Sequence, residues 1–168
     1  MAIESDYQSQ ALAIMDEYLA AAKILLTKRK SDNGVYGYTA LLIMLCFIEA
    51  LDHLDQSVKY PQDNNLSFLA EEPFGLNNNT QIINQIKHWY KNGLSQVGAL
   101  PENVFIEMGE DDDYPFMVID SEVKSVSLKG LLNALNFIWD FQREDFTAGQ
   151  IEYVKEIGIP SPSYKPEH

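Results

Sequence analysis

Cysteine, arginine and histidine are scarce in this chain of 168 residues: there is one cysteine, two arginines and three histidines. A single cysteine excludes an internal disulfide bond, which fits a reducing compartment. Cys46 lies inside an apolar run, and we expect it to be a core residue rather than a reactive thiol. The sequence also lacks a glycine-rich phosphate loop, a nucleophile elbow and a zinc-ligand cluster.

Long apolar runs are missing as well. The longest, residues 40–48, has about half of the ~20 residues that a membrane span needs. Residues 1–6 contain no basic region followed by an apolar stretch, so we expect no signal peptide. These absences predict a cytoplasmic protein that does not enter a membrane.

Positive charge is the third scarcity. The chain has 25 acidic residues against 12 lysines and arginines, and its net charge is −13. Such a charge works against binding to RNA or to anionic membranes. The hydrophobic content of 46% is typical of a globular protein, and the length fits one domain. We predict a single helical domain over residues 1–158, followed by a proline-rich tail over residues 159–168.

The apolar periodicity predicts a mainly α fold. Helices are expected near residues 5–30, 36–58, 79–97 and 128–142, and a short one over residues 150–157. Residues 104–108 and 114–119 are expected to be strands that pair as a β-hairpin around an acidic turn, with residues 123–126 as an extension. The prediction is an up-and-down helical bundle of four to five helices with one small β-hairpin between helices 3 and 4.

Three further details follow from residue types. Residues 40–48 are apolar on every side, which is typical of the buried centre of a bundle. An asparagine of residues 77–79 or Thr80 is expected to cap the third helix, and Gly98 and Pro101 to end it. Between the second and third helices we expect a loop with a short helical turn, whose apolar anchors are Phe68, Leu69 and Phe74.

The third helix combines an apolar stripe with a short polar string. The stripe recurs at spacings of three and four and comprises Ile82, Ile83, Ile86, Trp89, Tyr90, Leu94 and Val97. Five polar side chains fall mostly off this stripe, namely Lys87, His88, Lys91, Asn92 and Gln96. This string is the part of the sequence that suggests a function.

The order of elements and the string Lys91-Asn92-x-Leu94-x-Gln96 resemble the HEPN superfamily of small helical-bundle proteins. The resemblance is greatest to small bacterial HEPN-like proteins whose third helix reads Arg-Asn-x-Leu-x-His before a short hairpin. It covers residues 5–142 in overall order, whereas the specific motif is short. It implies a homodimer and a metal-independent ribonuclease ancestry, in which the arginine stabilises phosphate charge and the histidine moves a proton.

Both chemical positions of that motif are changed in this sequence. Lys91 keeps the positive charge of the arginine but lacks its planar, bidentate fork. Gln96 replaces the histidine and cannot act as an acid or base near neutral pH. Neither Arg29 nor Arg143 is followed by a histidine at the required spacing. We therefore expect that catalysis of the HEPN type is lost.

Two other clusters contain side chains that can bind metal ions. Glu49 and His53 are spaced i, i+4 on the second helix and could share a metal ion, but the other helices supply no matching Glu-x-x-His pairs. A solvated helix end is the favoured interpretation of this pair. Residues 110–113 lack the alternating spacing of a calcium loop, and we expect a solvated turn. No cofactor is expected.

Three hypotheses for function remain open. The first is a non-catalytic HEPN-like binding module, with a second copy or another protein as its partner, in a toxin–antitoxin or defence-type system. The second is a metal-independent RNA endonuclease with altered residues, in which His88 and Lys91 act together at i, i+3. The third is a helical bundle, unrelated to HEPN proteins, that binds a small ligand. In all three hypotheses Tyr90, which directly precedes Lys91, belongs to the candidate site.

Overall fold

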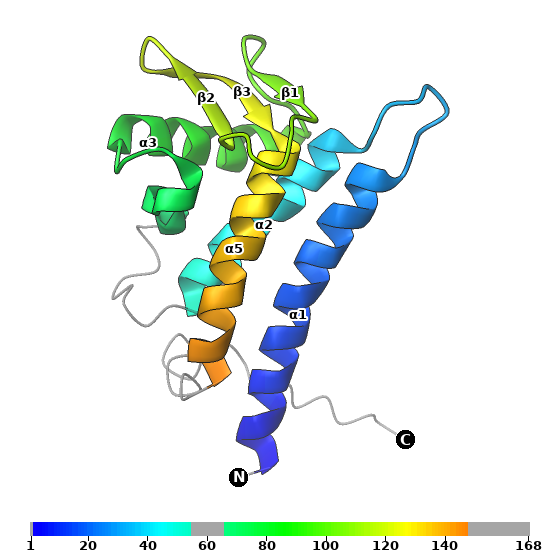
Figure 1. Cartoon of the computed structure of the whole chain (residues 1–168), viewed down its shortest axis with the longest axis vertical. Coiled ribbons are helices and arrows are strands. Elements are labelled where there is room, and N and C mark those ends of the chain that lie inside the picture. The colour runs from blue at the N-terminus through cyan, green and yellow to red at the C-terminus, as the bar shows by residue number, and fades with distance from the viewer. Residues whose placement is uncertain (1, 55–65, 148–168) are drawn as a thin grey trace.

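Three long helices form the body of the molecule. The computed structural model describes residues 2–54 and 66–147. Helix α1 (Ala2–Thr27) rises toward a small β-sheet, and α2 (Gly37–Leu54) and α5 (Leu128–Thr147) run back from it, as Figure 1 shows. The sheet covers one end of these helices, and α1 begins at the opposite end. The prediction of a mainly α fold is confirmed.

The core is centred on α2, as its apolar composition predicts. Among the most deeply buried side chains are Leu41, Met44, Phe47, Ile48 and Leu51, all from this helix. By length and composition α2 could also cross a membrane, but a core helix meets the same test, and half of α2 is buried inside the fold. Helices α1 and α5 pack on α2 and on each other.

A polar contact fixes α5 against α1. The Trp139 indole N–H donates to Asp16 Oδ1 at 2.7 Å, and Arg143 Nη2 lies 3.0 Å from Asp16 Oδ2. Partial burial would raise the pKa of Asp16, but the hydrogen bonds from Arg143 and Trp139 outweigh it and lower that pKa. One of the two arginines of the chain is therefore engaged in holding the bundle together.

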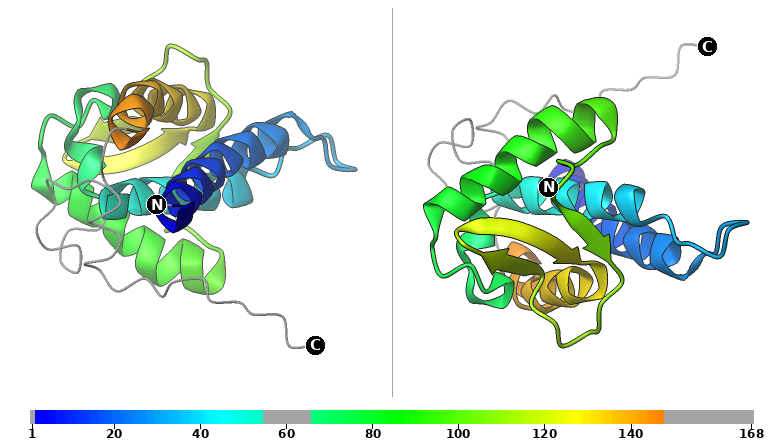
Figure 2. Two further views of the ribbon diagram at one scale, coloured as in Figure 1. Left: turned by 90° about the horizontal axis from the view of Figure 1, so that it is seen from below. Right: turned by 90° about the horizontal axis from the view of Figure 1, so that it is seen from above.

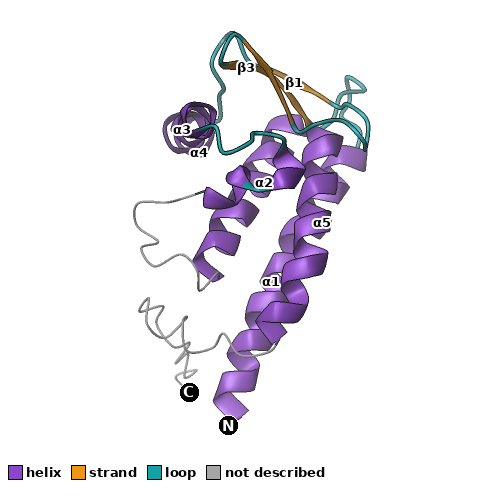
Figure 3. Cartoon of the chain, turned by 60° about the vertical axis from the view of Figure 1, so that its left-hand side comes forward, coloured by secondary structure: helices purple, strands orange, loops and turns teal. Residues whose placement is uncertain are grey.

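Helix α3 (Thr80–Trp89) crosses the bundle rather than running along it, and Figure 3 shows it end-on. The Asn79 side chain accepts a hydrogen bond from Ile82 N at 3.3 Å, so the predicted cap is confirmed. The helix is preceded by two short 3₁₀ helices, η1 (Ser67–Ala70) and η2 (Glu72–Phe74). Their anchors are the predicted ones, because Phe68, Leu69 and Phe74 are all buried.

The sheet differs from the predicted hairpin. It has three strands, β1 (Phe105–Glu107), β2 (Phe116–Ile119) and β3 (Glu122–Ser127), in the order β1-β3-β2. The first two do not pair with each other: β1 is parallel to β3, whereas β2 is antiparallel to β3. The real hairpin joins β2 to β3 through Asp120 and Ser121, both at positive φ as a type I′ turn requires. The predicted pairing around the acidic turn was therefore wrong.

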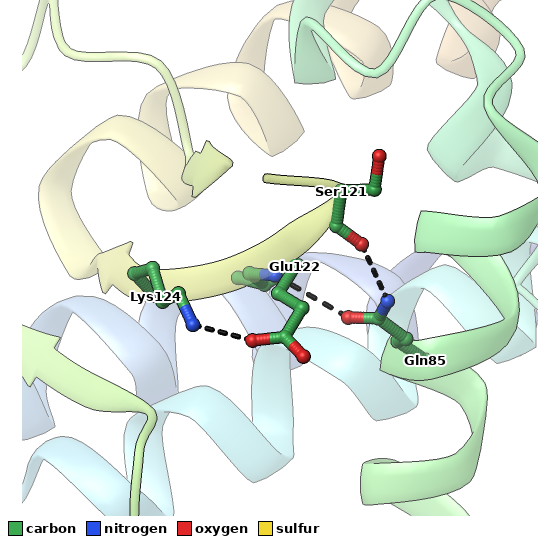
Figure 4. Close-up of polar contacts among 5 residues, drawn as sticks. Gln85, Ser121, Glu122 and Lys124 are labelled. Carbon is green, nitrogen blue, oxygen red and sulfur yellow. Dashed lines mark hydrogen bonds and ion pairs between the residues drawn. The ribbon is translucent and has the colours of Figure 1, made fainter. Parts of the chain in front are cut away.

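The side chain of Gln85 joins α3 to this hairpin. Its amide N–H donates to Ser121 O at 2.8 Å, and its carbonyl oxygen accepts from Val123 N at 3.3 Å (Figure 4). The amide thereby bonds to the backbone on both sides of Glu122, which itself pairs with Lys124. Because one planar amide makes both bonds, the position of α3 relative to the sheet is fixed.

Several predicted boundaries need adjustment. Helix α1 begins at Ala2 rather than near residue 5, and it ends at Thr27. Ser127 Oγ accepts from Gly130 N at 3.1 Å, which confirms the expected start of α5. The end predicted for the second helix at residue 58, the helix at 150–157 and the tail at 159–168 lie outside the described residues.

Candidate functional site on the third helix

The polar string of the third helix coincides with a π-helical turn, which sequence reasoning did not predict. After α3 the chain forms η3 (Tyr90–Leu94), a π-helix, and then the last helical turn, α4 (Ser95–Val97). The Ser95 N–H reaches back five residues to Tyr90 O. The three segments form one rod beside the sheet (Figure 2). Short π-helical turns inside α-helices occur frequently at functional sites.

Two glycines shape the end of this rod. A Cβ atom at Gly93 would lie 2.4 Å from the carbonyl oxygen of Ala99, so the returning chain leaves no space for a side chain. The backbone N–H of Gly98 donates to Gly93 O at 3.0 Å. Gly98 itself has φ of 68°, the left-handed conformation that ends helices, as predicted.

The π-turn also explains one error in the predicted apolar stripe. Six of its seven members are buried, but Val97 is 73% exposed. A π-turn holds one residue more than an α-turn, so every later residue is rotated by about 100° around the helix axis. Val97 therefore points away from the core, next to the polar string.

The inner side of the turn is held by Tyr90. Its hydroxyl donates to Glu49 Oε2 at 2.5 Å and lies 3.4 Å from Cys46 Sγ. Burial, followed by the contacts with Cys46 and Glu49, raises the pKa of Tyr90 above its ordinary value. The phenol therefore stays protonated and remains a donor to the Glu49 carboxylate. Glu49 thus serves to anchor the turn on α2.

The outer side presents the other motif residues to solvent. His88, Lys91, Asn92 and Gln96 are all exposed. Asn92 Nδ2 lies 2.9 Å from His88 Nδ1, so a hydrogen bond joins the amide to the imidazole. Lys91 forms no ion pair with any described residue. The structure therefore brings Tyr90 and Glu49 together beneath the turn, and His88 with Asn92 above it.

A second carboxylate of α2, Asp52, has a structural role that sequence reasoning missed. Asp52 is 2% exposed and accepts hydrogen bonds from Ser67 N and Ser67 Oγ, each at 2.6 Å, and from Phe68 N at 3.1 Å. Burial raises its pKa to about 6, although the hydrogen bonds from Ser67 and Phe68 act in the opposite direction. A signal existed in the sequence, because Asp52 follows Ile48 by four residues on the buried side of the helix.

The predicted metal candidates do not form a ligand set. Glu49 accepts from Tyr90, and His53 is half-buried one turn further along α2. Within residues 2–54 and 66–147, no group of three or more His, Cys, Asp or Glu side chains could hold a metal ion. The interpretation of these residues as a helix end with mixed charge stays a prediction.

The local charge of this site is positive, whereas the net charge of the whole chain is negative. Between Glu72 and Glu102 the sequence contains Lys87, His88 and Lys91 and no acidic residue. The net charge of −13 is therefore carried elsewhere, and the third helix is locally basic. An exposed, locally basic face can attract anionic groups, so the whole-chain argument against such partners does not apply here.

Fold and site together define a mainly helical protein with a small mixed sheet and an exposed basic face on a π-containing helix. No protein-family model matches the chain, and no curated protein or solved structure matches it either.

Proposed function

We propose that this chain is a non-catalytic, HEPN-like interaction module that binds a partner through the outer face of its third helix. That face, the motif face, consists of His88, Lys91, Asn92, Gln96 and Val97. The proposal rests on the difference between the two sides of the turn, of which one is anchored to the core and the other is exposed. Tyr90 anchors the turn to Glu49 from below, while polar groups and one exposed valine lie above. Interfaces commonly combine an apolar contact with polar ones.

The chemistry of the motif face favours recognition over catalysis. Lys91 supplies a positive charge, and Gln96 supplies an amide that cannot act as an acid or a base near neutral pH. The acid-free stretch from Pro73 to Pro101 favours a partner with an anionic surface. A second copy of this strongly acidic chain offers such a surface, so a homodimer is the first assembly to test. The resemblance to HEPN proteins extends the proposal to a toxin–antitoxin or defence-type system.

Sedimentation velocity of the purified chain tests this proposal. We expect a dimer whose dissociation constant rises at least tenfold in Lys91→Glu and in Val97→Asp, because charge reversal and a buried carboxylate both oppose the interface. Ile24→Asp is the matched control for Val97, since Ile24 is also exposed, at 60%, and lies on α1. A monomer at all concentrations, or equal weakening by the control, would contradict a homodimer through the motif face.

One observation favours a second candidate, a metal-independent RNA endonuclease with altered residues. His88 has its Nδ1 occupied by Asn92, and Lys91 lies in the same exposed stretch. An oriented imidazole beside a cation is suited to proton transfer next to a phosphate. Incubation with total RNA in the presence of a chelator distinguishes the candidates. We expect intact RNA; cleavage that is lost in both His88→Ala and Lys91→Ala would establish the nuclease instead.

A further inference from the structure

A hollow of about 380 Å³ lies between η2, the loop before β2 and one side of α5, and none of its lining residues belongs to the motif face. Ligand sites in proteins commonly have volumes of 300–1,000 Å³. Its floor is formed by small residues of α5, Gly130 and Ala134. Two exposed aromatic rings, Tyr114 and Phe137, contribute to its walls. The hollow therefore offers aromatic surface above a floor without bulky side chains.

The walls are held in place by close backbone packing. A Cβ atom at Gly75 would lie 2.5 Å from Tyr114 Cδ1, so the tyrosine ring rests directly on this turn. A Cβ atom at Gly130 would lie 2.4 Å from Asp113 O, which shows how closely the loop approaches α5. Asp113 Oδ2 accepts from Glu110 N at 2.7 Å and fixes the loop internally. Contacts within the protein therefore preform the hollow.

The charges that line the hollow in the described part of the chain all have one sign. Glu72, Asp111, Asp112 and Asp113 line it, and no described lysine or arginine does. The nearest basic side chain in sequence, Lys129, pairs with Glu110 at 3.6 Å. Phe137 stacks edge-on against Phe141 at 5.1 Å between ring centres, which keeps its ring outside the core. Aromatic faces next to carboxylates are the surroundings that a guanidinium group prefers, because it stacks on rings and pairs with oxygen.

We propose that this hollow binds an arginine side chain presented by a basic segment of a partner protein. The guanidinium lies between Tyr114 and Phe137 and pairs with the carboxylates of the acidic loop. The charge of the hollow is complementary to such a segment, and its open, partly apolar shape accommodates a side chain with its alkyl stem. This site is independent of the motif face, and it recognises the opposite charge.

The test is a titration of the isotope-labelled full chain with the peptide acetyl-Gly-Gly-Arg-Gly-Gly-amide, followed by amide chemical shifts in NMR spectra. We expect shifts confined to residues that line the hollow, above all Asp111, Asp112, Tyr114 and Phe137. The same peptide with citrulline, the neutral isostere of arginine, is expected to produce none of them. Shifts spread evenly over all acidic surfaces would overturn the proposal, because they would report only the net charge.

Variants localise the effect. Phe137→Ala and Asp112→Asn are each expected to raise the dissociation constant about threefold, and together about tenfold. The matched controls are Phe105→Ala, which removes another exposed ring, and Glu102→Gln, which removes another exposed carboxylate. Equal weakening by the controls would overturn the site. Tighter binding of spermidine than of the peptide would also overturn it, in favour of a small polyamine.

Discussion

Helix α2 holds two neighbouring segments of the chain through two carboxylates one turn apart, and the two contacts differ in kind. Asp52 accepts from the backbone and side chain of η1 and is 2% exposed. Glu49 accepts from the side chain of Tyr90 and is half-buried. The first contact satisfies backbone donors with a buried carboxylate, whereas the second joins a buried tyrosine to a half-buried carboxylate.

This difference indicates which contact serves the fold and which serves the site. Buried backbone N–H groups need a partner, and losing one costs about 1–3 kcal/mol. The half-buried Glu49 carboxylate can turn to water at a smaller cost when Tyr90 no longer donates to it. The η1 contact is therefore expected to dominate stability, whereas the Tyr90 contact is expected to govern the position of the π-turn. The predictions below separate these two roles.

The largest effect is expected for Asp52→Ala. The substitution removes the acceptor for Ser67 N, Ser67 Oγ and Phe68 N at once. We expect the free energy of unfolding at pH 5, measured with urea, to fall by about 4 kcal/mol. Asp52→Asn retains one acceptor oxygen and should lose about half as much. An alanine variant as stable as the native chain would show that water replaces the carboxylate, and that the comparison with Glu49 is mistaken.

The pH dependence of stability sharpens the same comparison. The pKa of Asp52 rises from 3.8 in the unfolded chain to about 6 in the fold. Because the folded value is the higher one, the stabilising contribution is complete below about pH 4 and is lost as the pH rises through 6. Between pH 4 and pH 7 the native chain should lose about 3 kcal/mol relative to Asp52→Asn. Parallel curves for the two proteins would contradict the raised pKa.

Local patterns predicted much of the fold. The all-round apolar residues 40–48 became the core helix, and Asn79 caps α3 as its residue type suggested. Strand positions were also recognised, but their partners were not. Pairing depends on contacts between distant residues, and the turn at Asp120 and Ser121 lacks the Asn-Gly or Asp-Gly pair that marks a type I′ hairpin.

The candidate site was predicted less completely. The polar string was found in the sequence, but the π-turn beneath it was not. Tyr90 and Leu94 are four residues apart, which is also the spacing of an apolar stripe on an α-helix, so the sequence pattern does not reveal the π-turn. The contact between Glu49 and Tyr90 joins residues 41 positions apart, and helical periodicity contains no information about such pairs. The acidic hollow likewise combines η2, the loop before β2 and α5, three segments that meet only in the fold.

The smallest effect on stability is expected for Tyr90→Phe. This substitution tests the contribution of the Glu49 contact separately from that of Asp52. The substitution removes the hydroxyl that donates to Glu49 Oε2 and leaves the buried ring in place. We expect a loss of about 1 kcal/mol in the free energy of unfolding. Tyr38→Phe, at an exposed tyrosine of α2, is the matched control and should change almost nothing.

A double-mutant cycle with Glu49→Ala then assigns the loss to the contact itself. If the hydroxyl and the carboxylate act on each other, the two substitutions together should cost about 1 kcal/mol less than the sum of their separate effects. Amide exchange of residues 90–97 should quicken in Tyr90→Phe without a matching change in η1, because the π-turn loses its anchor while Asp52 keeps its own. Additive energies, or equal loosening of both segments, would mean that Glu49 and Asp52 do not play separate roles.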